Sequence, residues 1–344
     1  MQFNKYAKME NSYQEKWLDI IRQNGLDIGQ FCVTEKIHGS NFSFITNGEE
    51  IREGKRTSVI GESESFQGCH TIVDGLRPQI LELFKEVSNL NGGIDGIEQM
   101  QVFGEIFGGF YPHDDVPPDN NVGRIQKGVY YHPSIRWRAF DIRVQGKDWA
   151  AYVNADVKFT LFEQAGVPYM APLFIGTLQE CLDYPCEFES TVSALYGLPP
   201  IEGNNAEGKV ITPMTERRFG QTRVILKHKG EKWTEKAKEP KKIRPPKTLG
   251  PDLVAAIEEA SKYVTENRFL NVVSKEPFTE MKQFGTMMRL LLGDVMEDFS
   301  RENPGLIHKL GKSERKDLNK NISRMATPIV KEYAQKNIFE GDKE

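Results

Sequence analysis

The segment 234–251, which reads TEKAKEPKKIRPPKTLGP, constrains the fold of this chain more than any other part. Its four prolines remove backbone hydrogen-bond donors, and together with the lysine run they exclude a continuous helix or strand. The chain has 344 residues, which is more than a single domain usually contains. We therefore predict two domains, 1–233 and 251–344, joined by a basic, proline-rich linker over 234–250.

The region 1–233 is dominated by short apolar runs of strand length that are rich in β-branched and aromatic residues. These runs are FCVTEKI, FSFI, MQVFGEIFG, RWRAFDIRV, KVIT and RVILKHK. Helical patterns interrupt them at 14–22, 76–87 and 156–165. The sequence predicts an α+β domain of mixed or antiparallel sheets with flanking helices.

The region 251–344 has a different pattern, because its apolar residues recur at spacings of three and four. Three helical segments are expected, at 252–275, 279–303 and 313–337, so this domain is predicted to be smaller and all helical. The run GLIHKLGKS at 305–313 resembles a phosphate-binding loop. Its glycines are separated by five residues where that motif requires four, and helical segments flank it, so we reject the phosphate-binding interpretation.

Composition favours a soluble protein in the cytoplasm or another reducing compartment, and we expect a monomer. The longest uncharged stretch, 164–179, is shorter than the roughly 20 apolar residues of a membrane-spanning helix. Residues 1–10 lack the apolar core of a signal peptide. Four cysteines are too few for a disulfide framework, and six scattered histidines form no zinc pattern.

The charge is distributed unevenly, although the net charge is only -4. Residues 216–247 contain twelve lysines or arginines and four glutamates, a local charge of +8. Such a segment is either a solvated linker or the docking site of an anionic partner such as nucleic acid.

The sharpest chemical signal is EKIHGSNF at 35–42, where a strand pattern ends at a lysine that is followed by His-Gly. A lysine in partly buried surroundings can become a nucleophile, because desolvation and neighbouring cations lower the pKa of an amine. Gly39 would let the backbone approach a ligand. Taken alone, Lys36 has the simpler explanation of a surface cation.

Five further fragments follow in order, and together they are hard to explain as structure alone. They supply fixed cations for phosphates, carboxylates on strands, an aromatic face beside an acid, and two lysines on one face of a strand. The fragments are Lys55-Arg56-Thr57, Phe103-Gly104-Glu105-Ile106, Phe140-Asp141, Glu207-Gly208, and Lys227-His228-Lys229.

This ordered set resembles the covalent nucleotidyltransferases, the superfamily of DNA ligases, RNA ligases and mRNA capping enzymes. The form K-x-H-G-x-N is similar to the branch typified by bacteriophage T4 RNA ligase 2 and the trypanosome RNA editing ligases. Residues 267–275 with Phe284-Gly285 resemble the helical C-terminal domain of that branch. The resemblance covers nearly the whole chain.

The resemblance implies a role for each matching position. Lys36 would carry AMP, Glu35 would read the adenine amino group, and Phe140 would stack on the base with Asp141 beside it. Ile37 would line the nucleotide pocket, and Asn41 and Arg56 would lie near the reactive phosphate and the ribose. Glu105 would contact the ribose or a metal-bound water. Glu207, with Glu105, would hold Mg²⁺ or Mn²⁺, while Lys227 and Lys229 would bind the α-phosphate and the pyrophosphate.

The chain departs from the family pattern at one place. The family has a Lys or Arg five residues after the glutamate of the Glu-Gly motif, and here that residue is Thr212. Lys209 has the opposite strand parity and cannot simply replace it. Either Arg217, Arg218 or Arg223 supplies the missing cation, or one catalytic step is impaired. The segment 109–118 also looks like an insertion; its His and Asp residues fit either a surface loop or a metal site.

The resemblance therefore implies an ATP-dependent RNA ligase that joins a 3′-OH to a 5′-phosphate through a lysyl-AMP and an adenylylated RNA end. Alternatives are an adenylation-only or RNA-binding relative, motivated by Thr212, and a DNA ligase or capping enzyme, which usually has an OB domain where helices are expected here. The substrate stays open between a nick in duplex RNA, a broken tRNA loop and an RNA/DNA hybrid.

Overall fold

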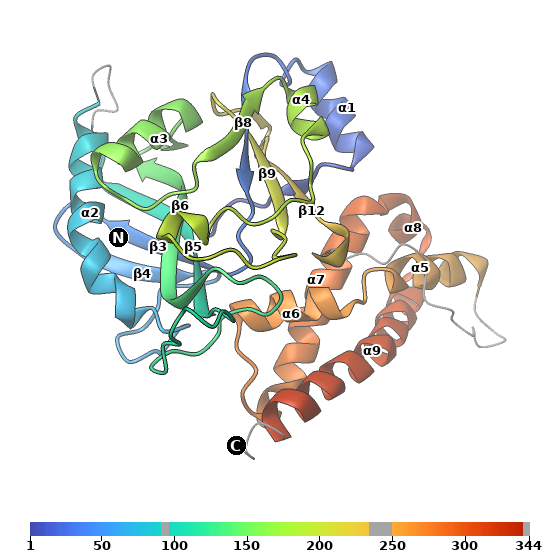
Figure 1. Cartoon of the computed structure of the whole chain (residues 1–344). Helices are drawn as coiled ribbons and strands as arrows, with labels where there is room; N and C mark the ends of the chain where they lie inside the picture. Colours follow the sequence, from blue (N-terminus) through green and yellow to red (C-terminus); the bar gives the residue numbers. More distant parts are fainter. Residues whose placement is uncertain (91–95, 234–249, 340–344) are drawn as a thin grey trace. The chain divides into compact units, whose positions relative to one another are not determined.

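The computed structural model describes residues 1–90, 96–233 and 250–339 (Figure 1). The chain divides into two compact units, Met1–Lys232 and Trp233–Glu344. The predicted linker 234–250 lies outside the described residues, except for Gly250.

The first unit contains two five-stranded sheets, as the strand patterns predict. The first sheet has the order β1-β12-β9-β2-β8, and its pairs are antiparallel apart from β1 with β12. Its strands are β1 (Glu10–Asn11), β2 (Phe31–Glu35), β8 (Pro172–Gly176), β9 (Gly208–Pro213) and β12 (Leu226–Lys229).

The second sheet has the order β4-β3-β5-β6-β7 and is antiparallel throughout. Its strands are β3 (Ser40–Thr46), β4 (Ile51–Lys55), β5 (Gln99–Phe110), β6 (His132–Gln145) and β7 (Ala150–Tyr152). A short hairpin of β10 (Arg218–Phe219) and β11 (Thr222–Arg223) precedes β12. The mixed α+β fold class predicted from the sequence is confirmed.

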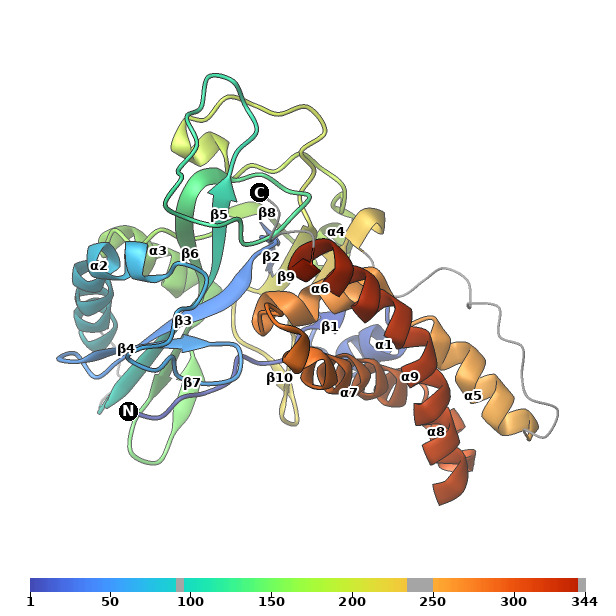
Figure 2. The same cartoon turned by 90° about the horizontal axis from the view of Figure 1, so that it is seen from below.

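Helices cover the outer side of each sheet. The helices α2 (His70–Ser88) and α3 (Ala155–Gln164) bury their apolar faces against the second sheet, which lies between them and the first sheet (Figure 2). The helices α1 (Glu15–Gln23) and α4 (Leu178–Asp183) pack on the first sheet, with a short 3-10 turn at Ala194–Tyr196 further along the chain. Among the described residues no helix is both long and apolar enough to cross a membrane.

Strand β6 shows how period-two alternation separates the core from the opposite face of the sheet. Ile135, Trp137 and Ala139 are buried in the core under α2 and α3. Because successive side chains of a strand point to opposite faces, Arg136 and Arg138 lie on the other face, which is the face turned toward the first sheet. Functional side chains of this strand are therefore expected on that face.

The second unit consists of five helices within the part of the chain that the structure describes, packed around one apolar core. They are α5 (Pro251–Ser261), α6 (Glu266–Lys275), α7 (Phe284–Glu302), α8 (Pro304–Lys309) and α9 (Lys312–Ala334), with a 3-10 turn at Met281–Gln283 and a π-helical turn at Gln335–Phe339. A further 3-10 turn, Glu231–Trp233, lies at the boundary between the two units. The all-helical character of this region is confirmed.

The single helix expected over 252–275 is wrong, because the chain breaks between α5 and α6. The Thr265 side chain caps the second helix by accepting a hydrogen bond from the Arg268 backbone N–H at 3.2 Å, which starts a new helix there. The buried Arg268 guanidinium then pairs with Asp298 at 2.9 Å and also with Asp294. The run at 305–313 forms α8 and the start of α9, as expected for a helical segment rather than a phosphate-binding loop.

Candidate active site

The candidate nucleophile Lys36 lies where the chain leaves β2 and crosses to β3 in the second sheet. Its backbone N–H donates to the Gly208 carbonyl at 2.9 Å, which fixes the residue beside the start of β9. Its Nζ donates to Oε2 of Glu207 at 2.5 Å. The Lys36 side chain is 16% exposed, so the amine is held by a buried partner and still reaches solvent.

Glu207 is the hub of this site, because two lysines and a histidine share its buried carboxylate. Oε1 lies 2.8 Å from Nζ of Lys229, and Oε2 lies 3.6 Å from Nδ1 of His38 as well as against Lys36. Burial alone would raise the pKa of Glu207, but Lys229 and Lys36 hold it well below its usual range. The carboxylate is therefore ionised and available as an anionic ligand.

Two motif glycines allow the strands to approach closely at the site. A side chain at Gly39 would place its Cβ 2.2 Å from the Ile106 carbonyl oxygen in β5. A side chain at Gly208, which has φ +149°, would place its Cβ 2.0 Å from the His228 carbonyl oxygen in β12. Both contacts are far shorter than real Cβ atoms make, so the structure requires glycine at these positions.

Glu105 is the second carboxylate of the site, and it lies on β5 directly opposite Asn41 of β3. Desolvation raises the pKa of Glu105 to about 7, with Lys36 opposing the rise and the charge of Glu207 adding to it; Arg56 also opposes it. The structure thus places Lys36 and Glu207 close enough to Glu105 to influence its pKa. Arg56 is also close enough to Glu105 to influence this pKa. Glu105 titrates near neutral pH.

Lys227 and Lys229 lie on one face of β12, as the sequence predicts. Lys227 is opposite Val210 and Lys229 is opposite Gly208. In this register Lys229 contacts Glu207. Lys227 lies two residues before Lys229 on the same face of the strand. The two amines therefore form a cationic edge beside Lys36.

The residues that the resemblance assigns to the adenine base and its pocket are buried or half-buried, and they contact neighbouring side chains. Glu35 is 2% exposed, and it accepts hydrogen bonds from the Ser190 hydroxyl at 2.6 Å and from the Thr191 N–H and hydroxyl at 2.8 Å each. Burial raises the pKa of Glu35. Ile37 is buried, and the half-buried Phe140 ring contacts Tyr6 edge-on at 5.0 Å between centroids. Glu35 is therefore bound through the loop that carries Ser190 and Thr191.

A second ionic cluster, centred on Asp141, is closed to solvent. Asp141 Oδ1 lies 3.1 Å from Nζ of Lys158, and Oδ2 lies 2.8 Å from Nη1 of Arg223 and accepts from the Tyr6 hydroxyl at 2.9 Å. Arg223 also forms two 2.7 Å hydrogen bonds to Glu216. Burial would raise the pKa of Asp141, but Arg223 and Lys158 lower it. The cluster joins the N-terminal segment, β6, α3 and β11.

The three arginines considered as substitutes at Thr212 have different surroundings. The Nε, Nη1 and Nη2 atoms of Arg223 are all used in the Asp141 cluster. Arg217 donates to the Gly25 carbonyl at 3.5 Å, near the start of β2, and Lys36 follows the end of that strand. Arg218 is exposed and lies 3.5 Å from Glu216.

A lysine outside this group of three arginines influences the cross-strand partner of Thr212. Thr212 is paired with Cys32 of β2. Burial raises the pKa of the Cys32 thiol to about 11, and the charge of Lys158 opposes that rise. Lys158, which comes from α3, is therefore close enough to influence Cys32, the cross-strand partner of Thr212. The sequence gives no local sign of this, because Lys158 lies far from the Glu-Gly motif.

Lys209 has a structural role, which agrees with its position on the face of β9 opposite to that of Thr212. It is fully buried, and its Nζ donates to the carbonyls of Cys181 at 2.8 Å and Leu182 at 2.7 Å and also to that of Tyr184. These are the unsatisfied carbonyls at the end of α4. Lys209 therefore caps α4 from the back of the strand whose other face carries the site.

Two more site groups were missed in the sequence. The Tyr131 hydroxyl accepts the His38 backbone N–H at 2.8 Å and so fixes the loop after Lys36. Arg138 is directly opposite Glu105 in the β5–β6 register. The signal for Arg138 was present, because Arg136, Arg138 and Phe140 alternate along RWRAF. Tyr131 had no such signal.

The segment 109–118 forms a surface connection rather than a metal cluster. His113 Nδ1 lies 3.9 Å from Asp115, which is largely exposed. Within the described ranges no group of three or more His, Cys, Asp or Glu side chains is arranged to hold a metal ion. The Tyr111 hydroxyl donates to the Pro199 carbonyl and ties this segment to the loop before β9.

A unit of two sheets that bring a lysine and a buried glutamate together, followed by a helical unit, is the architecture expected of a nucleotidyltransferase with a helical C-terminal domain. The sequence profile of the RNA ligase family matches residues 29–229, and that of the T4 RNA ligase 2 C-terminal domain matches residues 250–328. The chain belongs to the RNA ligase family, in the branch of T4 RNA ligase 2 and the trypanosome RNA-editing ligases.

Two curated relatives agree with this assignment. RNA-editing ligase 2, mitochondrial, of Trypanosoma brucei brucei is 26% identical over 93% of this chain and 88% of its own length. RNA-editing ligase 1, mitochondrial, of the same organism is 27% identical over 93% of this chain and 80% of its own length.

Solved structures show a weaker similarity. A Naegleria gruberi RNA ligase mutant with ATP and Mn has a TM-score of 0.43 and 16% identity, over 67% of this chain and 57% of that chain. A further mutant of that ligase without ligand has a TM-score of 0.44 and 16% identity, over 67% of this chain and 56% of that chain. The chain spans a little over half the length of these structures.

Proposed function

We propose that this protein is an ATP-dependent RNA ligase that seals 3′-OH and 5′-phosphate RNA ends. The observation that carries the proposal is the Lys36 amine, held 2.5 Å from an ionised, buried Glu207 at the crossing between two sheets. In the first step Lys36 Nζ attacks the α-phosphorus of ATP, a P–N bond forms, and pyrophosphate leaves. The nucleophile must first give up a proton, and Glu207 and Glu105 are the carboxylates beside it.

Two later transfers complete the reaction. An oxygen of the RNA 5′-phosphate attacks the lysyl-AMP, which releases Lys36 and gives an adenylylated end. The 3′-OH then attacks the 5′-phosphorus, forms the phosphodiester, and releases AMP. Lys227, Lys229 and Arg56 would stabilise the charge on the phosphates through charge-assisted hydrogen bonds. Glu35, Ile37, Asn41 and Phe140 would position the nucleotide.

The carboxylates fit a divalent cation. Burial raises the pKa of Glu105 and the charge of Glu207 adds to the rise, so the two carboxyl groups lie close enough to interact. Mg²⁺ or Mn²⁺ takes hard oxygen ligands and is usually held by one or two carboxylates together with substrate phosphates. Glu207 and Glu105 would hold the ion, which supplies charge neutralisation at the phosphates when it is bound.

The domain arrangement supports RNA as the substrate. The second unit contains residues 250–328, which match the C-terminal domain of T4 RNA ligase 2. We assign it, together with the basic linker 234–250, to gripping the RNA. A fragment of residues 1–240 should fold and still label itself with AMP, because every residue assigned to the first step lies within it. Its sealing should be weaker than that of the full chain; an insoluble fragment or full sealing contradicts this division.

Thr212 favours a second candidate, an adenylation-only relative that does not seal. Two measurements separate the candidates. The full chain is first incubated with ATP labelled in the α-phosphate, and then with a nicked RNA that is already adenylylated. Self-labelling with sealing supports the ligase, and self-labelling without sealing supports the second candidate. Absence of a lysyl-AMP would remove both.

A further inference from the structure

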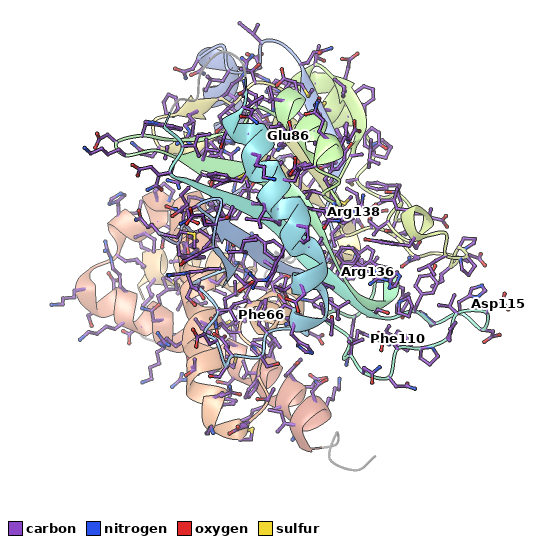
Figure 3. The ribbon with its side chains drawn as sticks, turned by 90° about the vertical axis from the view of Figure 1, so that its left-hand side faces the viewer. Phe66, Glu86, Phe110, Asp115, Arg136 and Arg138 are labelled. Atoms are coloured by element: carbon purple, nitrogen blue, oxygen red, sulfur yellow. The ribbon has the colours of Figure 1, made fainter. Side chains whose placement is uncertain are left out.

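Two arginines extend from the candidate active site along the face of β6 that is opposite the helices. Arg138 faces Glu105 and Arg136 faces Phe107 in the register of β5 and β6. Figure 3 shows Arg138 and then Arg136 along this edge of the unit, with Phe110 beyond them. Arg138 therefore lies beside Glu105, a carboxylate assigned to catalysis, and Arg136 lies further from it along the strand.

Arg136 and Arg138 are fixed by hydrogen bonds to backbone carbonyls rather than by ion pairs with carboxylates. Arg138 Nε donates to the Tyr169 carbonyl at 2.8 Å, and Arg136 Nη1 donates to the Ile135 carbonyl at 3.2 Å. In the ranges described by the structure, neither forms a salt bridge with a carboxylate. The charge of Arg136 acts on Asp119 and that of Arg138 acts on Glu35, but hydrogen bonding from Asn121 and burial, respectively, are the main influences on the pKa of these carboxyl groups. Their positive charge remains available to an external anion.

Aromatic rings accompany the arginines. The Tyr196 ring centroid lies 5.8 Å from the Cζ atoms of both Arg136 and Arg138. At the other end, the exposed Arg124 guanidinium lies 3.6 Å above the Phe110 ring, which is 38% exposed. We call this surface the arginine track; it consists of Arg124, Arg136 and Arg138 with the rings of Phe110, Tyr130 and Tyr196.

The track has a defined length. It runs from the Glu105 and Arg138 pair to the Phe110 and His132 pair. At about 3.3 Å per strand residue this is about 20 Å. The acidic loop tip at Asp115 lies beyond Phe110 and limits the positive surface there (Figure 3). A short nucleic-acid segment matches this length.

We propose that the arginine track binds unpaired nucleotides next to the break in the RNA substrate, an inference that rests on the proposed ligase function. Guanidiniums supply contacts to phosphates, and guanidinium planes and rings provide stacking surfaces for splayed bases. Paired bases stack on each other and cannot use these surfaces. The track therefore favours a substrate such as a broken loop over a fully paired nick.

The test uses the full chain and two 5′-phosphorylated RNAs that differ only in whether the six nucleotides beside the break are paired. The variants are Arg124→Gln/Arg136→Gln and, separately, Tyr196→Leu. The control is Arg22→Gln/Arg52→Gln, which removes the same charge from exposed positions on α1 and β4. Affinity is measured as a function of KCl, and self-adenylylation and thermal unfolding are measured in parallel.

We expect the unpaired RNA to bind the double arginine variant about tenfold more weakly, with a salt slope smaller by about 1.4 because two single-strand phosphate contacts are lost. Tyr196→Leu should cost about fivefold or more through lost stacking. Paired RNA, self-adenylylation and the control should change less than about twofold.

Three results would overturn the inference. They are unchanged affinity in both variants, an equal loss for paired RNA, and a loss of self-adenylylation with intact RNA binding, which would assign the arginines to the nucleotide site instead. The failure of the proposed function has a separate signature, because a wild-type chain that neither labels itself nor seals would remove the ligase assignment. If Tyr196→Leu unfolds, the arginine pair still decides the question.

Discussion

Glu207 and Asp141 are both buried carboxylates shared by two cations, and yet the two sites have opposite character. Glu207 binds Lys36 and Lys229, whose side chains are 16% and 10% exposed. Asp141 binds Lys158 and Arg223, which are almost fully buried, and the Tyr6 hydroxyl completes its shell. The two acids are equally buried, so the clusters differ in the exposure of their cations. The partly exposed lysines of Glu207 can exchange partners, whereas the buried cations of Asp141 hold the fold together.

The difference has a physical origin. A buried charge pair must be satisfied completely, because each unsatisfied group bears the full desolvation cost. The Asp141 cluster meets this condition, with Arg223 also bound to Glu216 and its Cζ 3.4 Å from the Tyr152 ring centroid. The Glu207 cluster retains lysines that water and phosphates can reach. Five predictions test this contrast.

The largest effect is expected at the nucleophile. Lys36→Ala should abolish covalent AMP labelling without unfolding the protein, since the amine is partly exposed and forms one ion pair. Lys36→Arg should also fail, because a guanidinium stays protonated and cannot attack phosphorus. Denaturing gels of protein incubated with labelled ATP give the readout, with thermal unfolding as the control. A label that persists on Lys36→Ala would mean that another residue is the nucleophile.

Removing one carboxylate from each cluster should separate activity from stability. Asp141→Asn removes the ion pair of the buried Lys158 and one of the two carboxylate partners of Arg223, which keeps Glu216. It should cost about 3–5 kcal/mol in the free energy of unfolding. Urea denaturation measures this. A variant as stable as the wild type would show that the Asp141 cluster is not structural.

Glu207→Gln should show the reverse pattern. Its lysines can turn to solvent, so we expect a small change in stability and a loss of about 10² to 10³ in the rate of self-adenylylation. Single-turnover labelling at saturating ATP measures the rate. A variant that loses stability and activity in the same proportion as Asp141→Asn would erase the contrast between the clusters.

A smaller effect tests whether Lys158 compensates for Thr212. Lys158→Met should cost about 1.5–3 kcal/mol, the usual contribution of a hydrogen bond to a charged group. Adding Thr212→Lys should recover part of that loss, because the new amine starts from a position next to Cys32. Thr212→Met is the matched control and should recover nothing. Thr212→Lys alone should change little in adenylation or sealing; a large gain in either rate contradicts the compensation.

The most gradual effect concerns Glu105, because burial raises its pKa from 4.5 to about 7. The folded protein binds more protons than the unfolded chain between these pH values, so this group stabilises the fold below about pH 4.5 and the contribution is lost as pH rises through 7. With EDTA present, wild-type stability should fall relative to Glu105→Gln by on the order of 1 kcal/mol per pH unit in that window. If the stabilities of the two proteins change with pH by the same amount, the raised pKa of Glu105 is ruled out.

Local patterns in the sequence predicted much of this molecule. Alternation along RWRAFDIRV and RVILKHK predicted β6 and the shared face of Lys227 and Lys229. Strand β8 was not predicted, since its uncharged segment contains prolines and lacks alternation. The break between α5 and α6 was missed although Thr265 is a helix-capping residue type.

The partners of the site residues could not be predicted in the same way. Ser190 and Thr191 bind Glu35 across about 155 residues of chain, and Lys158 reaches Asp141 from a helix that has no motif of its own. Such contacts depend on how α3 and the loop before β9 pack, and this packing leaves no periodic signal. The assigned roles of Lys36, Glu105 and Glu207 in catalysis stay predictions.

Lys209 has a consequence for how mutational data on this chain are read. It lies two positions after Glu207 and is as buried as any residue in the protein, with its amine committed to the end of α4. A screen that scores cell survival through RNA repair would rank Lys209 beside Lys36, because loss of folded protein and loss of chemistry look the same to growth. Protein abundance would tell them apart: cells would accumulate the Lys36 variants and degrade those of Lys209.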